Sequence, residues 1–204
     1  ADWIDPVVTT ADGKQYDLTE MKYLRGTCGW GNIAVDKNIN GGTLSINGQQ
    51  YQNGIAVHAN SILLYKLPEG AVKFTAYAGL DNTGTDQGSK SSVEFMVCNY
   101  DPTIRTETTD QWNGGNKTIK VDPSRQAATS GFIGKDAGVK SAQIEADITG
   151  AEKLYLVVTD GGDGLSYDHA DWANPVLIDK DGNEHSLTEI AWDANPINGW
   201  NAPK

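Results

Sequence analysis

Hydrophobic and polar residues alternate in several short stretches of the chain. Residues 72–80 place one set of side chains on one face (Val72, Phe74, Ala76, Ala78) and another set on the opposite face (Lys73, Thr75, Tyr77). This period of two is typical of a half-buried β-strand. Two other segments follow the same pattern, at 92–98 and 142–148, and a further strand at 153–159 follows the Thr-Gly-Ala-Glu turn. Weaker strand candidates lie at 62–67, 117–121 and 175–178.

No segment keeps apolar residues at i, i+3 and i+4 long enough to predict a helix, and residues 18–24 would form at most one short turn. Glycine is abundant, with 23 residues in the connections and strands. Many short strands with glycine-rich connections are typical of an antiparallel β-sandwich or jelly roll. The sequence therefore predicts an all-β fold, with long loops at 99–115 and 123–140.

The two ends of the chain resemble each other. Residues 2–7 (Asp-Trp-Ile-Asp-Pro-Val) recur as 171–176 (Asp-Trp-Ala-Asn-Pro-Val), an offset of 171 − 2 = 169. Nine residues are identical over the twenty positions from 2 to 21, and Gly29-Trp30 recurs one residue out of phase as Gly199-Trp200. Either the chain carries the end of one tandem unit and the start of the next, or its ends form equivalent strands of a pseudo-symmetric sandwich. Both interpretations divide the chain into an N-terminal strand (1–17), a sandwich (18–180) and a C-terminal extension (181–204) that resembles the start of a further repeat.

Length and charge narrow the possible partners. A chain of 204 residues is long enough for one sizeable core. The formal net charge of −11 repels phosphate backbones, so we expect no nucleic-acid partner. No apolar run approaches the roughly 20 residues of a membrane helix, so we expect no membrane insertion. Cys28 and Cys98 match no zinc or redox motif; they form either one disulfide or two buried thiols, and the apolar pattern before Cys98 favours thiols.

The usual catalytic motifs are missing from the sequence. It contains no Gly-x-Ser-x-Gly elbow, no glycine-rich phosphate loop and no His-Glu-x-x-His zinc helix. A glycosidase needs two carboxyl groups at a defined separation, and the many acidic residues single out no such pair. We therefore predict a non-catalytic protein, with a hydrolase as the least favoured alternative.

Two motifs suit the recognition of a sugar. Trp30 stands between Gly29 and Gly31, which is a poor arrangement for core packing and a good one for exposing the ring. Sugars present apolar C–H faces that lie flat on indole rings. His58 stands just before the apolar run 62–67, where a neutral imidazole could both donate and accept hydrogen bonds. The structural alternatives are a core tryptophan at a loop edge and a histidine that only stabilises the fold.

The segment 159–172 concentrates acidic and aromatic side chains in a glycine-rich stretch. Clustered carboxylates in such a loop suit calcium, which prefers oxygen ligands, and we name Asp160, Asp163 and Asp168 as candidate ligands. Carboxylates also accept strong hydrogen bonds from sugar hydroxyls. A plain turn capped by aspartate side chains is the third possibility.

Several of these motifs, in this order, resemble the NPCBM domains, which form carbohydrate-binding module family 51. They are Gly29-Trp30-Gly31, Gly-Ile-Ala-Val-His-Ala at 54–59, Gly-Leu-Asp at 79–81, Leu-Tyr-Leu-Val-Val-Thr-Asp at 154–160 and Tyr-Asp-His-Ala-Asp-Trp-Ala at 167–173. The resemblance covers roughly residues 18–178. It implies a galactose-binding-domain-like jelly roll, with a structural calcium in some members.

The resemblance also implies a function. Members recognise terminal galactose or related glycans, and the matching positions place Trp30, Lys37, His58, Asp171 and Trp172 in a sugar pocket. Such modules are usually attached to secreted bacterial glycoside hydrolases, so we expect a secreted, periplasmic or cell-surface protein with tandem copies or an attached hydrolase. The alternative is a structural or adhesive spacer of a surface protein whose sugar site is lost or occluded.

Overall fold

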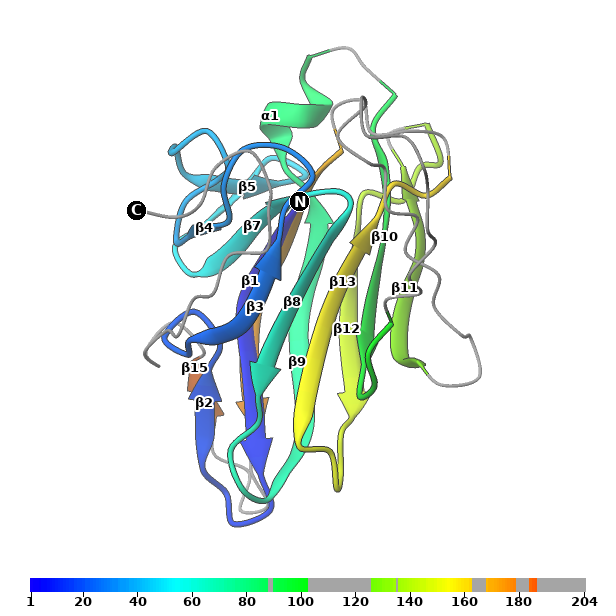
Figure 1. Ribbon diagram of the computed structural model, residues 1–204. Coiled ribbons are helices and arrows are strands. Elements are labelled where there is room, and N and C mark those ends of the chain that lie inside the picture. Colours follow the sequence, from blue (N-terminus) through cyan, green and yellow to red (C-terminus); the bar gives the residue numbers. More distant parts are fainter. Residues whose placement is uncertain (88–89, 103–125, 135, 163–167, 179–183, 187–204) are drawn as a thin grey trace.

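The computed structural model describes residues 1–204 except 88–89, 103–125, 135, 163–167, 179–183 and 187–204. At residues 126, 172–178 and 184–186 it describes the backbone alone. Two antiparallel β-sheets pack face to face, as Figure 1 shows. The only helix among the described residues is the single turn α1 (Asn82–Thr85), which caps one end of the sandwich. The predicted all-β antiparallel sandwich is confirmed.

The first sheet has five strands in the order β11-β10-β13-β8-β3. Their bounds are Tyr23–Thr27 (β3), Ser61–Lys66 (β8), Ser92–Cys98 (β10), Gln126–Gly134 (β11) and Lys153–Thr159 (β13). Strands β10 and β13 have the bounds that the sequence predicts. Because β10 and β13 lie inside the sheet, both of their faces are apolar and buried.

The second sheet is larger. Its strands are β1 (Asp2–Thr10), β2 (Gln15–Asp17), β4 (Ala34–Val35), β7 (Gly54–His58), β9 (Ala71–Leu80), β12 (Ser141–Asp147), β14 (His169–Ile178) and β15 (Glu184–Ser186). Strand β9 pairs with β12 on one side. Both β1 and β14 pair antiparallel with β7 and with β9. A separate hairpin joins β5 (Leu44–Ile46) to β6 (Gln49–Tyr51).

Large aromatic side chains fill the space between the sheets. The Trp3 ring is fully buried and meets Phe74 and Phe95 edge-on, with ring centroids 5.9 and 5.2 Å apart. Edge-to-face pairs at such distances are a favoured aromatic geometry. Phe74 and Phe95 come from the alternating strands β9 and β10, so the pattern of the sequence explains how each sheet covers the other.

Part of the loop prediction for 123–140 is wrong, because residues Gln126–Gly134 form strand β11 at the edge of the first sheet. The segment contains Ala127, Ala128 and Gly131 in place of large apolar residues, and its pairing with β10 is interrupted by register shifts. An edge strand of this kind leaves almost no alternating signal. The predicted strand at 117–121 lies outside the described residues.

The cysteines are two free thiols, as favoured from the sequence; Cys98 is buried and Cys28 is half-buried. No helix in the described part of the chain is long and apolar enough to cross a membrane.

Candidate functional site

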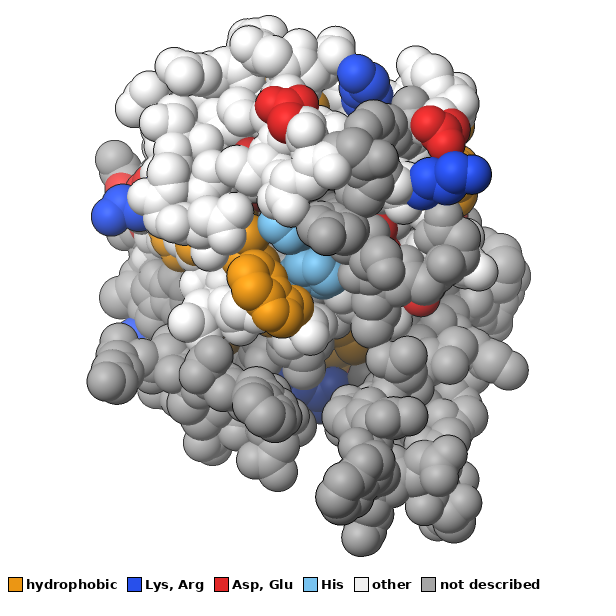
Figure 2. Space-filling view, turned by 90° about the horizontal axis from the view of Figure 1, so that it is seen from above, with side chains coloured by type: hydrophobic (Ala, Val, Ile, Leu, Met, Phe, Trp, Pro, Cys, Tyr) orange, Lys and Arg blue, Asp and Glu red, His pale blue; other side chains and the backbone are white. Residues whose placement is uncertain are grey.

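Three aromatic rings meet at the end of the sandwich near α1. Trp30 is 57% exposed, whereas His58 and His169 are each 5% exposed. The Trp30 and His169 rings are nearly parallel, at an interplanar angle of 4° and a centroid distance of 6.0 Å, so they form an offset pair. The His58 ring lies 5.1 Å from that of His169 and 6.0 Å from that of Trp30. Figure 2 shows histidine atoms in a hollow beside an exposed hydrophobic side chain.

The two histidines face each other because of strand pairing. His58 ends β7, His169 begins β14, and the two residues are direct cross-strand partners. Side chains of such partners lie on the same face of a sheet. The register thus brings together two residues that are 111 positions apart (169 − 58).

Hydrogen bonds fix the protonation pattern of both imidazoles. His58 Nδ1 lies 2.7 Å from the carbonyl oxygen of Ala59, which can only accept, so Nδ1 carries the proton. The Thr83 hydroxyl donates to the carboxylate of Asp81. Its oxygen, 3.3 Å from His169 Nδ1, therefore accepts the proton of that nitrogen. In both rings Nε2 is left as an acceptor, which suits it to receive a hydroxyl proton.

Burial keeps both rings neutral. Desolvation lowers the pKa of His58 to about 4. Desolvation, assisted by His58, lowers the pKa of His169 to about 3. At neutral pH the two imidazoles are consequently hydrogen-bonding groups without charge.

The backbone before Trp30 is fastened to β7. The Cys28 sulfur lies 3.0 Å from the Trp30 carbonyl oxygen and accepts the His58 amide at 3.2 Å. Gly29 donates its amide to the His58 carbonyl at 3.0 Å. A Cβ atom at Gly29 would stand 2.0 Å from the carbonyl oxygen of Ala59, so only glycine fits there. These contacts present the Trp30 ring beside the histidines.

The structure brings Trp30 and His58 together, as the sequence predicts, and it rules out a core position for Trp30. It adds His169, which the sequence places in the acidic segment without indicating its partner. Thr83 and Cys28 were also missed, since their roles depend on contacts between distant segments.

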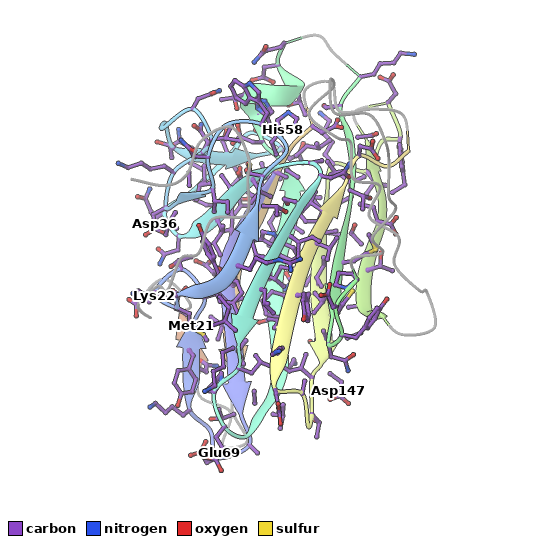
Figure 3. All side chains as sticks on the ribbon, viewed as in Figure 1. Met21, Lys22, Asp36, His58, Glu69 and Asp147 are labelled. Atoms are coloured by element: carbon purple, nitrogen blue, oxygen red, sulfur yellow. The ribbon has the colours of Figure 1, made fainter. Side chains whose placement is uncertain are left out.

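Lys37 lies elsewhere. It is exposed and follows Asp36, whose amide and carboxylate bond to Gly54 at the start of β7. His58 is at the far end of that strand, roughly 13 Å away by the rise per residue. Figure 3 shows Asp36 well separated from His58. The described contacts therefore do not place Lys37 with the three rings.

Asp171 is fully buried, and burial raises the pKa of its carboxyl well above the usual range. It lies two residues after His169 on β14, beneath the surface that the rings form. The Trp172 side chain lies outside the described residues. Roles of Lys37, Asp171 and Trp172 in sugar binding stay predictions.

Two of the three candidate calcium ligands bind backbone amides. Asp168 is buried and accepts the Ser92 amide at 3.0 Å, which anchors the start of β10. Asp160 accepts the Gly162 amide at 3.2 Å within its own turn. Asp163 lies outside the described residues. The Asp160 bond is that of a capped turn, whereas the Asp168 bond joins two segments that are distant in the sequence. Calcium at this loop stays a prediction.

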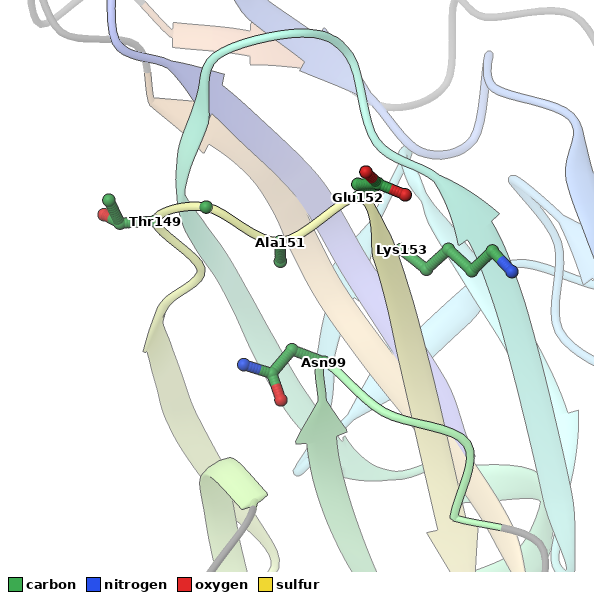
Figure 4. Close-up of a pocket in the computed structure, with 6 residues that line it drawn as sticks. Asn99, Thr149, Ala151, Glu152 and Lys153 are labelled. Atoms are coloured by element: carbon green, nitrogen blue, oxygen red, sulfur yellow. The ribbon is translucent and has the colours of Figure 1, made fainter.

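The opposite end of the sandwich holds a depression of about 380 Å³. Its lining comes from the loop between β12 and β13 and from the residue after β10 (Asn99, Thr149, Gly150, Ala151, Glu152, Lys153), as Figure 4 shows. None of these residues has an aromatic ring or an imidazole. This hollow therefore lacks the groups that recognise a sugar face, and we place the candidate site at Trp30.

Comparison with known proteins identifies the family. The sequence profile of the NPCBM/NEW2 domain matches residues 14–178, most of the chain. Alpha-1,3-galactosidase B of Akkermansia muciniphila is 27% identical over 146 residues, which are 71% of this chain and 15% of that enzyme. The chain thus spans about 15% of the length of this relative. The chain belongs to the NPCBM/NEW2 domain family.

Solved structures agree. The CBM51 module of Clostridium perfringens GH95, in complex with methyl-galactose, superposes with a TM-score of 0.58 at 26% identity and covers 78% of this chain and 95% of its own. A structure of the CBM51-2 and INT domains of Clostridium perfringens ZmpB gives a TM-score of 0.61 at 22% identity, over 79% of this chain and 30% of that one. The second likeness concerns the fold alone.

Proposed function

We propose that this member of the NPCBM/NEW2 family is a non-catalytic carbohydrate-binding module that holds a terminal galactose-type sugar against Trp30. One observation carries the proposal: an indole that is 57% exposed lies parallel to a buried, neutral histidine ring. The parallel rings offer an apolar platform, and the imidazoles add acceptors at its edge.

The chemistry of a pyranose fits this arrangement. Its C–H face stacks on the Trp30 indole, while its hydroxyls reach the Nε2 acceptors of His58 and His169. Because the pKa of His58 is about 4 and that of His169 about 3, both acceptors stay available at neutral pH. Groups already fixed by Ala59 and Thr83 lose little freedom when the sugar binds.

Two relatives support galactose as the sugar. The GH95 module of Clostridium perfringens was solved with methyl-galactose, and the Akkermansia relative is named as a galactosidase. At 26% and 27% identity, these relatives support galactose-type sugars as the class of ligand. The proposed ligand is therefore a terminal galactose residue of a glycan.

The relatives also support an extracellular setting. The Akkermansia relative is a galactosidase by name, and the region that matches this chain is only 15% of its length. We infer that the present domain targets an attached or neighbouring hydrolase to its glycan and is secreted with it. Tandem copies would raise the overall affinity by keeping the second site close to the glycan.

Isothermal titration with methyl-galactose, glucose and N-acetylglucosamine tests the proposal. We expect a dissociation constant for methyl-galactose on the order of 1 mM to 1 μM, and binding at least about tenfold weaker for glucose, whose C4 hydroxyl has the opposite configuration to that of galactose. No heat with any sugar and no signal on a broad glycan array would contradict the proposal and favour the spacer. Turnover of an aryl galactoside that a single carboxylate substitution abolishes would contradict the non-catalytic part.

A further inference from the structure

Strands β1 and β14 pair with the same residues of the same two neighbours. Asp2 and Asp171 both pair with Ala56 of β7 and Gly79 of β9. Trp3 and Trp172 likewise share their register partners on both strands, and so do the four later pairs along β9. Even the register shift falls at the same point, between Ile4 and Val7 in β1 and between Ala173 and Val176 in β14.

The hairpins that follow are equivalent as well. In β1–β2, Val7 pairs with Asp17; in β14–β15, Val176 pairs with Ser186. Both pairs differ by the 169 residues that separate the repeated sequences (176 − 7 and 186 − 17). Figure 1 shows β2 and β15 side by side at one end of the second sheet.

A regular sheet has room for only one strand at this place, although β1 and β14 both pair with β7 and β9 here. Hydrogen-bonded strands lie about 4.8 Å apart, so β7 and β9, when they share a common neighbour, leave room for a single strand. Simultaneous occupancy would also crowd two carboxyl groups together. Ligand atoms of Asp2, Asp81 and Asp171 lie within 4.8 Å of one another, all buried. Among the described residues, the oxygens of Asp2 have no hydrogen-bond partner, and Asp171 Oδ1 meets only the amino group of Ala1, at 3.5 Å. Buried carboxyl groups with so few partners are costly, and burial raises the pKa of Asp171 well above its usual range.

We propose that β1 and β14 are alternative occupants of one slot between β7 and β9, and that the displaced strand completes the same slot in a second unit of this fold. The family profile covers 14–178 and so includes β14 but not β1. One unit therefore needs one such strand, and this chain carries two.

The register and the apolar face of the displaced strand indicate which kind of unit would accept it. Trp3, Val7 and Val8 are fully buried in the slot, so the displaced strand would expose them to water. A sheet with a vacant slot accepts an extended strand through main-chain hydrogen bonds and side-chain pockets. The sequence of β1 matches the pockets of this fold because it repeats β14, which makes another unit of the same family the fitting acceptor.

Proline substitutions in the full chain test whether the two strands replace each other. Val8→Pro and Leu177→Pro affect residues that pair with the same Phe74, and proline removes a backbone donor from the ladder. Each single variant should lower the Tm by less than about 5 °C, because the other strand fills the slot, and the double variant by more than about 15 °C. Val157→Pro in β13 is the matched control. Because β13 has no duplicate, this single substitution should lower the Tm as much as the double variant does. If one single variant already shows the loss of the double variant, the strands are not interchangeable.

Cysteine trapping tests whether the displaced strand enters the slot of a second unit. Thr9 and Ile178 both pair with Lys73. Thr9→Cys and Ile178→Cys, each combined with Lys73→Cys, should both give an intramolecular disulfide, identified by peptide mapping. Isotope-labelled Ile178→Cys chains mixed with unlabelled Lys73→Cys chains should form mixed disulfides whose yield rises with concentration. Disulfides confined to one of the two intramolecular pairs, or no mixed disulfide at any concentration, would overturn the proposal. Sugar binding plays no part in either readout.

Discussion

The two ends of the sandwich differ in what their residues can bind. The end near α1 carries an exposed indole and two buried imidazoles, each tied to the backbone or to a neighbouring side chain. The opposite end has a depression of about 380 Å³, but it offers an amide, a carboxylate, an amine and a threonine hydroxyl.

Concavity alone therefore does not locate a binding site in this fold. A sugar needs a flat apolar surface and a few fixed polar groups, and a hollow without rings supplies neither stacking nor orientation. Fixed groups at the α1 end lose little entropy on binding, whereas long side chains such as Lys153 would lose their rotamer freedom. The following predictions test this contrast in order of expected effect.

The largest effect should come from removing the indole. Trp30→Ala removes the stacking surface and should weaken methyl-galactose binding by about 30-fold or more, a loss of about 2 kcal/mol, as measured by isothermal titration. Phe132→Ala, which removes another ring that is 50% exposed, is the matched control and should leave the affinity unchanged. A similar loss from Glu152→Ala or Lys153→Ala would instead assign the site to the opposite end.

The histidines should matter next, through their acceptor nitrogens. His169→Phe keeps a ring beside Trp30 but removes Nε2, and should weaken binding about tenfold, as expected for a lost hydrogen bond of about 1.4 kcal/mol. His58→Phe should act in the same direction. Comparison of the circular dichroism and Tm of the variants with those of the parent chain separates loss of the acceptor from loss of the fold. Unchanged affinity in both variants would show that the imidazoles only support Trp30.

Acid should weaken both binding and stability. In the unfolded chain the histidines have the ordinary pKa of about 6.5, while in the folded chain that of His58 is about 4 and that of His169 about 3. The unfolded state thus takes up protons first, and the stability that the neutral rings provide is complete above pH 6.5 and declines as the pH falls toward 4 and below. Affinity should stay constant from about pH 7 to 5 and fall about twofold near pH 4, where half of His58 is protonated.

The difference in unfolding free energy between the parent chain and His58→Phe isolates this contribution from that of the carboxylates. The difference should shrink on going from pH 7 to pH 4. A constant difference would mean that His58 titrates normally in the folded state.

The smallest effect concerns the loop that carries Trp30. Cys28→Ala removes the sulfur that joins the Trp30 carbonyl to the His58 amide and should weaken binding by about two- to threefold, since Gly29 still holds the loop. Cys98→Ala, at the other cysteine, should change the Tm more than the affinity because Cys98 is fully buried in the core. If Cys28→Ala left the affinity unchanged while Cys98→Ala lowered it, the Cys28 contacts would not position the Trp30 ring.

How far the sequence predicts this molecule depends on whether a feature is local. Strand β10 follows from alternation within seven residues and strand β13 from a short apolar run after a turn, and the exposure of Trp30 follows from the glycines on either side. The partnership of His58 with His169 depends instead on the register of β7 against β14, which nothing near either residue encodes. Strand β11 was missed because its small residues give no periodic signal. The repeat at the chain ends was visible in the sequence, but only the shared register shows that its two copies compete for one place.

The most direct test of the proposed site is an NMR titration of the full chain with methyl-galactose that follows the indole N–H signals of its six tryptophans and the backbone amides. The Trp30 signal, assigned by its absence in Trp30→Phe, should shift in a saturable way together with the amides of His58 and His169. The amides of residues 149–153 should stay in place. Saturable shifts at 149–153 with an unmoved Trp30 signal would contradict the account and assign sugar binding to the other end of the sandwich.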